Sequence, residues 1–377
     1  MAIFLRSTSF LRKEMGARIA ALALAWLCVA PTAFAQSDLS IPLQVKFGGY
    51  LDVFYAFDFD HPGTDARQPF LFNHNRHNEF NLNLGYIKAE VLHHRYRANL
   101  TLQTGTYAAD NYAEEPAELR NIFEAYAGLR LSANQDLWLD VGVFESHIGF
   151  EYAESIKNPT LTRSLVAEHS PYFLAGARLH WQPSDRWEFL AVAANGWQRI
   201  QRVEGNSLLS FGTMVHYTHS ENLKLNWSTL IGTDDPDTSR RMRYYNSVYA
   251  DIAFGEKWSL IAGFDIGAEQ KAKGSERYSA FYTPTLIVRH AFDRKWAVAV
   301  RGEYYNDPDG VIIATGTENG FDNAGFSLNV DYQPLQGVIC RVEGRMFNSR
   351  DAIFQTADEA LNYNAFIVAS IAVAFGN

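Results

Sequence analysis

The chain lacks paired cysteines and, beyond its first 35 residues, long hydrophobic runs. Its two cysteines are Cys28 and Cys340, and Cys28 falls in a segment that we expect to be removed, so no internal disulfide, zinc ribbon or CxxC redox site is expected. No later stretch approaches the ~20 uninterrupted apolar residues of a transmembrane helix. A Gly-rich phosphate loop and a G-x-S-x-G nucleophile elbow are also missing from the sequence, so no cofactor is expected.

Positive charge is scarce as well. The sequence has 33 basic and 42 acidic residues, a net charge of −9. Without the first 35 residues the balance becomes 29 against 41, or −12. Because no basic field remains, nucleic acid is not an expected partner.

Residues 1–35 have the features of a signal peptide. Basic residues precede an apolar run over 19–30, and Ala33 and Ala35 place small residues at the positions that signal peptidase reads. The alternative, an N-terminal membrane anchor, is disfavoured because the run is too short to span comfortably. We therefore expect cleavage near Ala35 and a single mature domain, 36–377.

The rest of the chain alternates apolar and polar residues at a period of two. Leu225, Trp227 and Ile231 share one parity, and Lys224 and Asn226 take the other. Such alternation is typical of a strand with different surroundings on its two faces. Because it recurs from about residue 43 to the end, it favours a closed sheet with lipid outside and water inside.

About sixteen segments carry this pattern, most of them near the ~9–11 residues that a tilted transmembrane strand needs. They are 45–59, 79–92, 95–105, 119–131, 137–144, 172–181, 187–194, 207–217, 223–231, 244–254, 258–266, 278–292, 296–305, 321–332, 338–347 and 362–375. Three features do not fit simply. The apolar residues change from even to odd positions between Tyr86 and Ile87, which suggests a bulge. Segment 187–194 is apolar on both faces. Pro284 lacks the backbone N–H that would donate a hydrogen bond to a neighbouring strand.

The connections alternate between short and long, and aromatic residues gather at the short ones. Trp181 and Trp187 bracket one short turn, and Phe292 and Trp296 bracket another, as in an interfacial girdle. We predict an all-β fold, a transmembrane antiparallel β-barrel of about 16 strands with short periplasmic turns and long external loops. Its last strand, which ends near Phe375, has the form that barrel-assembly machinery recognises.

Charged residues on the polar parity are the candidates for a water-filled lumen. Rows of arginine facing carboxylates would tune which solutes pass, although many of these groups could merely pair within the wall. An apolar lumen for hydrophobic substrates is disfavoured by the arginine rows. The wall candidates are Arg95, Arg97, Glu124, Asp140, Arg178, Arg289, Arg301, Glu303, Arg341, Glu343 and Arg345.

The connection 145–171 is long yet rich in apolar residues. An exposed loop would be more polar, so we expect it to fold into the lumen and narrow it, with Glu145, Glu151 and Arg163 near the constriction. The alternatives are packing over the barrel mouth and a subunit contact.

Three groups of residues have some features of a metal or catalytic site. His74 and His77 with Glu79 fit a solvated loop better than a metal site, and Ser146 and His147 are adjacent, so they cannot form a folded triad. Two Asp-Pro-Asp segments suit turns without calcium. No metal site and no catalytic residue are expected.

One block carries a family resemblance. The sequence from Val143 to Glu151 (VFESHIGFE), followed by TLTRS at 160–164 and AEHSPY at 167–172, resembles the OmpL-like β-barrel porin family. Gly49 to Asp52 and Asn195 to Trp197 are also similar to it. The resemblance implies an outer-membrane diffusion channel.

We therefore predict an outer-membrane porin, not an enzyme, that lets small hydrophilic solutes or ions diffuse through a charged lumen narrowed by an infolded loop. Its expected partners are outer-membrane lipid, these solutes and the assembly machinery, with a homotrimer suggested by analogy alone. The alternatives are a surface receptor or adhesin and a lipid-modifying hydrolase.

Overall fold

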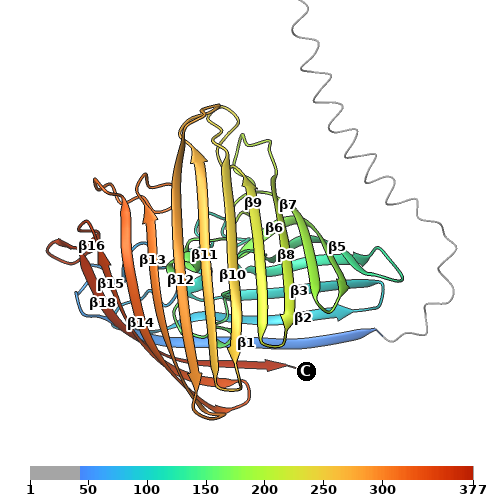
Figure 1. Ribbon diagram of the computed structural model, residues 1–377, viewed down its shortest axis with the longest axis horizontal. Coiled ribbons are helices and arrows are strands. Elements are labelled where there is room, and N and C mark those ends of the chain that lie inside the picture. Colours follow the sequence, from blue (N-terminus) through green and yellow to red (C-terminus); the bar gives the residue numbers. More distant parts are fainter. Residues whose placement is uncertain (1–42, 377) are drawn as a thin grey trace, which may run out of the picture. The chain divides into compact units, whose positions relative to one another are not determined.

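The computed structural model describes residues 43–376, which form one closed antiparallel β-barrel (Figure 1). The expected signal peptide, 1–35, lies outside the described residues, as do 36–42 and Asn377. Within the described part, sixteen strands follow one another around the sheet in chain order, and the last pairs with the first. The predicted barrel is therefore confirmed.

The barrel strands match the sixteen predicted segments to within a few residues at most ends. They are β1 (Gln44–Asp58), β2 (Glu79–Leu92), β3 (Tyr96–Thr104), β4 (Ile122–Arg130), β5 (Asp136–Glu145), β6 (Phe173–Ser184), β7 (Trp187–Ala194), β8 (Ser210–Ser220), β9 (Leu223–Gly232), β10 (Arg243–Phe254), β11 (Trp258–Gln270), β12 (Tyr278–Ala291), β13 (Trp296–Asp307), β14 (Phe321–Leu335), β15 (Val338–Ser349) and β18 (Tyr363–Gly376).

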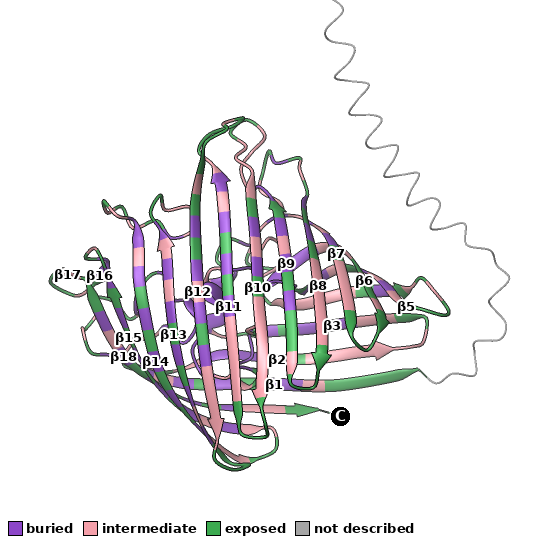
Figure 2. Ribbon diagram, viewed as in Figure 1, coloured by how far each residue is buried: buried purple, intermediate pink, exposed green. Residues whose placement is uncertain are grey.

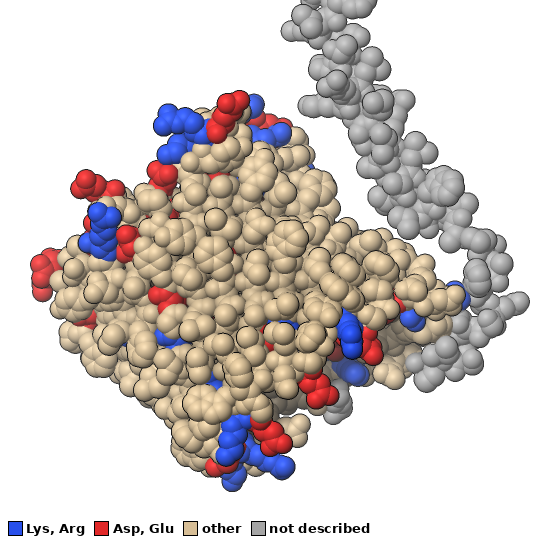
Figure 3. Space-filling view, viewed as in Figure 1, with Lys and Arg blue, Asp and Glu red and all other residues tan. Residues whose placement is uncertain are grey.

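Alternation along each strand separates two surfaces (Figure 2). Trp227 on β9 and Phe264 on β11 are 54% and 45% exposed, whereas Asn226 and Asp265 beside them are buried. Exposed apolar side chains suit lipid, and the closed ladder gives every strand two hydrogen-bonded neighbours, which hydrocarbon requires. In Figure 3, charged residues gather mainly at the strand ends, and most of the surface between them is uncharged.

The strand connections are short at one end of the barrel and long at the other, as predicted. The short turns are 93–95, 131–135, 185–186, 221–222, 255–257, 292–295 and 336–337, and the long loops are 59–78, 105–121, 146–172, 195–209, 233–242, 271–277, 308–320 and 350–362. Aromatic rings form tilted pairs at the short-turn end, with centroids 4.3 Å apart for Trp187 and Tyr217 and 4.5 Å for Trp296 and Tyr332.

Short elements occupy three of the long loops. The helices α2 (Thr106–Asn111), η2 (Ser155–Lys157) and α3 (Leu165–Glu168) lie in the second and third loops. A hairpin of β16 (Phe354–Gln355) and β17 (Ala360–Leu361), which the sequence did not predict, lies in the last one. No helix in residues 43–376 is long and apolar enough to cross a membrane.

The expected bulge in β2 occurs three residues before the change of parity. Asp52 pairs with Leu84 and Val53 with Leu82, which leaves Asn83 as the extra residue. As a result Leu84 is fully buried and the Tyr86 hydroxyl donates inward to Glu154 at 3.0 Å. A strict period of two counted from the outward-facing Phe80 would instead place Leu84 and Tyr86 on the outer surface.

The other two irregularities also have structural explanations. Val192 and Ala194 on the inner face of β7 pack with Phe144 and Leu174 in a small apolar cluster, so this strand is apolar on both sides because part of the inner wall is dry. At Pro284 the pairing of β12 with β13 is interrupted between Tyr282 and Thr285.

Candidate functional site

The inner wall near β3–β6 carries a cluster of two arginines around one carboxylate. The buried Asp140 accepts hydrogen bonds from Arg97 Nε and Nη2 at 2.8 and 2.7 Å and from Arg178 Nε at 2.9 Å. Glu124 accepts from Asn99 at 2.6 Å. These residues are on the inward parity that the sequence assigned to them.

Two wall candidates are placed differently from this group. Arg95 lies in the exposed turn 93–95 rather than on a strand, because β3 begins one residue later, at Tyr96. Arg289 on β12 is inside the barrel but forms a looser ion pair, 3.5 Å from Asp331.

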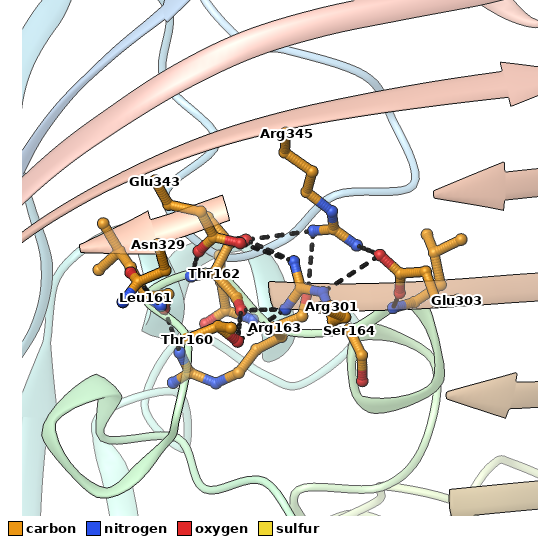
Figure 4. A network of polar contacts seen from close by, with 12 residues as sticks. Thr160, Leu161, Thr162, Arg163, Ser164, Arg301, Glu303, Asn329, Glu343 and Arg345 are labelled. Carbon is orange, nitrogen blue, oxygen red and sulfur yellow. Dashed lines mark hydrogen bonds and ion pairs between the residues drawn. The ribbon is translucent and has the colours of Figure 1, made fainter. Parts of the chain in front are cut away.

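The third long loop (residues 146–172) contacts the side of the barrel opposite its own strands. The loop joins β5 to β6. Because β13 is eight strands from β5 in either direction around the sheet, β13 lies on the opposite side of the barrel. The backbone N–H groups of Thr162 and Leu165 donate to Glu343 and Glu303, each at 2.6 Å. Leu161 N–H donates to Asn329 at 3.1 Å. Figure 4 shows this contact.

Two arginines complete the contact from the wall side (Figure 4). Arg301 donates to the Thr162 carbonyl at 2.6 Å and to Glu343 at 2.9 Å. Arg345 donates to the Arg163 carbonyl at 2.7 Å and to Glu303 at 2.5 Å. Both guanidinium groups are buried, and charge-assisted bonds of this kind are the stronger class of hydrogen bond.

Arg341 on β15 holds an earlier part of the same loop. Its guanidinium donates to the carbonyl oxygens of Ser155 at 2.6 Å, Asn158 at 2.9 Å and Thr160 at 3.1 Å. Asp331 pairs with the same group at 2.8 Å. These arginines therefore contact loop backbone and wall carboxylates rather than open lumen.

The beginning of the loop lies against the wall of β8–β11. The Ser228 hydroxyl donates to the His147 carbonyl at 2.7 Å, and the His147 ring lies 2.9 Å from the Thr229 carbonyl. Burial lowers the pKa of His147 to about 4. The ring of Phe150 lies over Gly263, where an added Cβ would approach it to 2.5 Å. Glycine at 263 therefore gives the loop room to lie close to the wall.

Glu151 binds another part of the loop, and Arg163 is buried within it. Glu151 accepts hydrogen bonds from the backbone N–H and the hydroxyl of Ser164. Burial raises the pKa of Glu151, and the nearby positive charge of Arg301 offsets only part of this increase. Arg163 is fully buried, donates to the Leu161 carbonyl at 3.4 Å and stands 6.0 Å from the ring centre of Tyr172.

Residues of other long loops are buried against the strands, which the period of two in the sequence does not indicate. Phe70 and Leu71 of loop 59–78, Ile313 of loop 308–320 and Phe354 of β16 join Leu161 in one buried apolar cluster with strand residues. Loop 59–78 is tied to the third long loop because Phe72 N–H and the Asn73 amide each donate to Glu168 at 3.0 Å. The signal that could have identified these loops is their apolar content.

A cavity of about 450 Å³ remains between the third long loop and β7–β11. A second cavity of about 230 Å³ lies beside β2–β6. Glu145, at the end of β5, and Lys157 line both of them. The space in the lumen is therefore on the side away from the β13–β15 contact.

The residues considered for metal binding have other partners. His74 lies 3.0 Å from the buried Asp52, and His77 accepts from Asp58 N–H at 3.1 Å. Asp307 accepts three backbone N–H groups of the following turn. In the described ranges, no three His, Cys, Asp or Glu side chains are grouped to hold a metal ion.

Comparison with known proteins agrees with this architecture. The family model described as "Putative beta-barrel porin-2, OmpL-like" matches residues 44–375. An anion-selective porin from Comamonas acidovorans has a TM-score of 0.60 at 9% identity, over 89% of this chain and 100% of that chain. The outer membrane channel DcaP of Acinetobacter baumannii has a TM-score of 0.56 at 10% identity, over 88% and 97%.

A third structure, the trimer form of OmpT from Vibrio cholerae, has a TM-score of 0.58 at 9% identity, over 88% of this chain and 99% of that chain. No curated protein sequence matches the chain. At these identities the solved structures show a common fold and nothing more.

Proposed function

Because this chain belongs to the OmpL-like β-barrel porin family and is an outer-membrane porin, we propose that small hydrophilic solutes or ions diffuse passively through it, along a charged lumen that the third long loop narrows. A sixteen-stranded barrel is wide enough to enclose an aqueous channel. Porins are not enzymes, so the family disfavours the lipid-modifying hydrolase, and no observed feature favours the receptor or adhesin.

The observation that carries this proposal is the placement of the third long loop between two walls. Thr162 and Leu165 are bonded to the β13–β15 side, and Phe150 rests on β11. The cavity that the loop leaves beside β7–β11 is lined by charged side chains, among them Glu145, Glu188 and Lys224. Charged groups around a narrow aqueous space favour hydrophilic solutes over apolar ones.

The same proposal covers targeting and partners. We propose that residues 1–35 are the cleaved signal peptide, that lipid surrounds the exposed apolar face, and that β18 is the segment recognised during assembly. In β18, Phe375 pairs with Gly49 at the point where the barrel closes. A homotrimer remains a proposal by analogy with other porins.

A swelling assay with neutral sugars of increasing size tests the size limit. Liposomes that contain the purified barrel should swell in monosaccharides and progressively less in larger oligosaccharides. Replacing Arg301 and Arg345 together by Met removes their bonds to the Thr162 and Arg163 carbonyls and loosens the loop, so larger sugars should then enter. Arg186 and Arg294 lie in exposed short turns, and replacing both by Met is the charge-matched control.

Two results would contradict the proposal. A folded barrel that admits no sugar is not a diffusion pore. A double variant with an unchanged size limit would mean that the bonds from Arg301 and Arg345 to the third long loop do not set that limit.

A further inference from the structure

The charges that line the larger cavity are unequal in sign. Its carboxylates include Glu145, Glu188 and Asp251, and its lysines are Lys157 and Lys224. Lys157 is already neutralised, because its ammonium group lies 2.8 Å from Glu154. Of the two lysines, Lys224 is therefore the one whose charge no ion pair within residues 43–376 balances.

These carboxylates have few basic partners. No basic side chain of the described part forms an ion pair with Glu145 or Asp251, and Asp251 and Lys224 occupy opposite positions on neighbouring strands. Within residues 43–376, the ion-pair partner of the Glu188 carboxylate is a histidine, His180, whose Nε2 lies 2.8 Å away. His147 adds no positive charge, since burial lowers its pKa to about 4.

The positive charges of the interior are held elsewhere. Arg301, Arg341 and Arg345 are buried against the third long loop and wall carboxylates. Arg97 and Arg178 share Asp140, and Arg178 lines the second cavity but not the larger one. Rows of arginine in the sequence therefore do not make the cavity positive.

We infer that the passage selects cations, with Glu145, Glu188 and Asp251 forming an acidic lining that attracts small hydrophilic cations and repels anions. This inference rests on the proposed diffusion function and adds the class of solute to it. Glu145 has the central position, because it faces both cavities. A carboxylate beside a narrow aqueous path acts on an ion within a few ångströms, where salt screens little.

Reversal potentials in a KCl gradient across a planar bilayer test the inference. The native channel should be more permeable to K⁺ than to Cl⁻. Glu145→Gln and Asp251→Asn should each lower the permeability ratio about two- to fourfold, the effect of one charge ~5 Å from a hydrated ion, and the double variant should lower it further. Lys224→Gln should raise it. Glu256→Gln, in the exposed turn 255–257, removes the same charge away from the cavity and should leave the ratio unchanged.

The possible failures are distinguishable. A conducting native channel that prefers Cl⁻ overturns the cation preference, and a double variant with the native ratio overturns its assignment to Glu145 and Asp251. Both results leave the diffusion function intact. A folded barrel that conducts nothing overturns the diffusion function and this inference with it. Lys224→Gln is expected to change the permeability ratio in the opposite direction, so the inference can still be tested if one carboxylate variant fails to fold.

Discussion

Arg301, Arg341 and Arg345 face the barrel interior, as their parity in the sequence predicts, yet their guanidinium groups bind loop backbone. The period of two fixes the side of the sheet on which a residue lies. It carries no information about what occupies the lumen opposite that residue. The sequence therefore predicts on which face of the sheet these charged side chains lie. It does not indicate which of them hold a loop and which, such as Asp251, line a cavity.

At the residue scale, we predict that Arg301→Met releases the third long loop. The change leaves Glu343 without the arginine that lies 2.9 Å away, and an unpaired buried charge costs about 3–5 kcal/mol. Amide exchange at Thr162, whose N–H is bonded to Glu343, should become faster in hydrogen-exchange measurements.

The double variant Arg301→Met/Glu343→Met provides the control for this prediction. Because it removes both charges, the loop should be disturbed less than by Arg301→Met alone. Unchanged exchange in the single variant would show that Arg301 does not hold the loop.

At the scale of elements, the strands were predictable and the short elements were not. The predicted segment 187–194 is identical to β7, because the aromatic-flanked turn 185–186 limits it at one end and the loop that begins with Asn195 and Gly196 limits it at the other. β11 extends to Gln270, four residues beyond its predicted end, because Gly267 and Ala268 interrupt the apolar pattern while the ladder with β12 continues. The two-residue strands β16 and β17 are too short to show any period.

Loop folding was predictable only in part. Apolar content is the basis of the prediction for the connection 145–171, and the same signal is present at Phe70 and Leu71 and again at Ile353 and Phe354, which are all buried. The hydrogen bonds that fix these loops join residues far apart in the chain, such as Phe72 and Glu168. Sequence periodicity cannot indicate such pairs.

At this scale we predict that Phe150→Ala widens the passage. The Phe150 ring lines the cavity and rests on Gly263, so its removal should increase single-channel conductance. Adding Gly263→Leu to that variant should refill the space and return conductance toward the native value.

Gly302→Leu is the matched control, because a Cβ at Gly302 meets nothing within 4 Å. It should have native conductance. Equal conductance in Phe150→Ala and the native protein would mean that the ions pass elsewhere.

At the scale of the whole molecule, one closed sheet separates two different environments. The outer surface exposes large apolar side chains such as Phe80 and Trp227, and the interior holds carboxylates, arginines and folded loops. A soluble protein seldom exposes so extensive an apolar surface. The closed ladder removes the unpaired edges that an open sheet would present to lipid.

The most direct test of the central claim is the current through a planar bilayer that contains the purified native barrel. We expect stepwise increases to steady open levels whose current is proportional to voltage. A barrel that inserts and is folded by circular dichroism, but passes no current, would contradict the account.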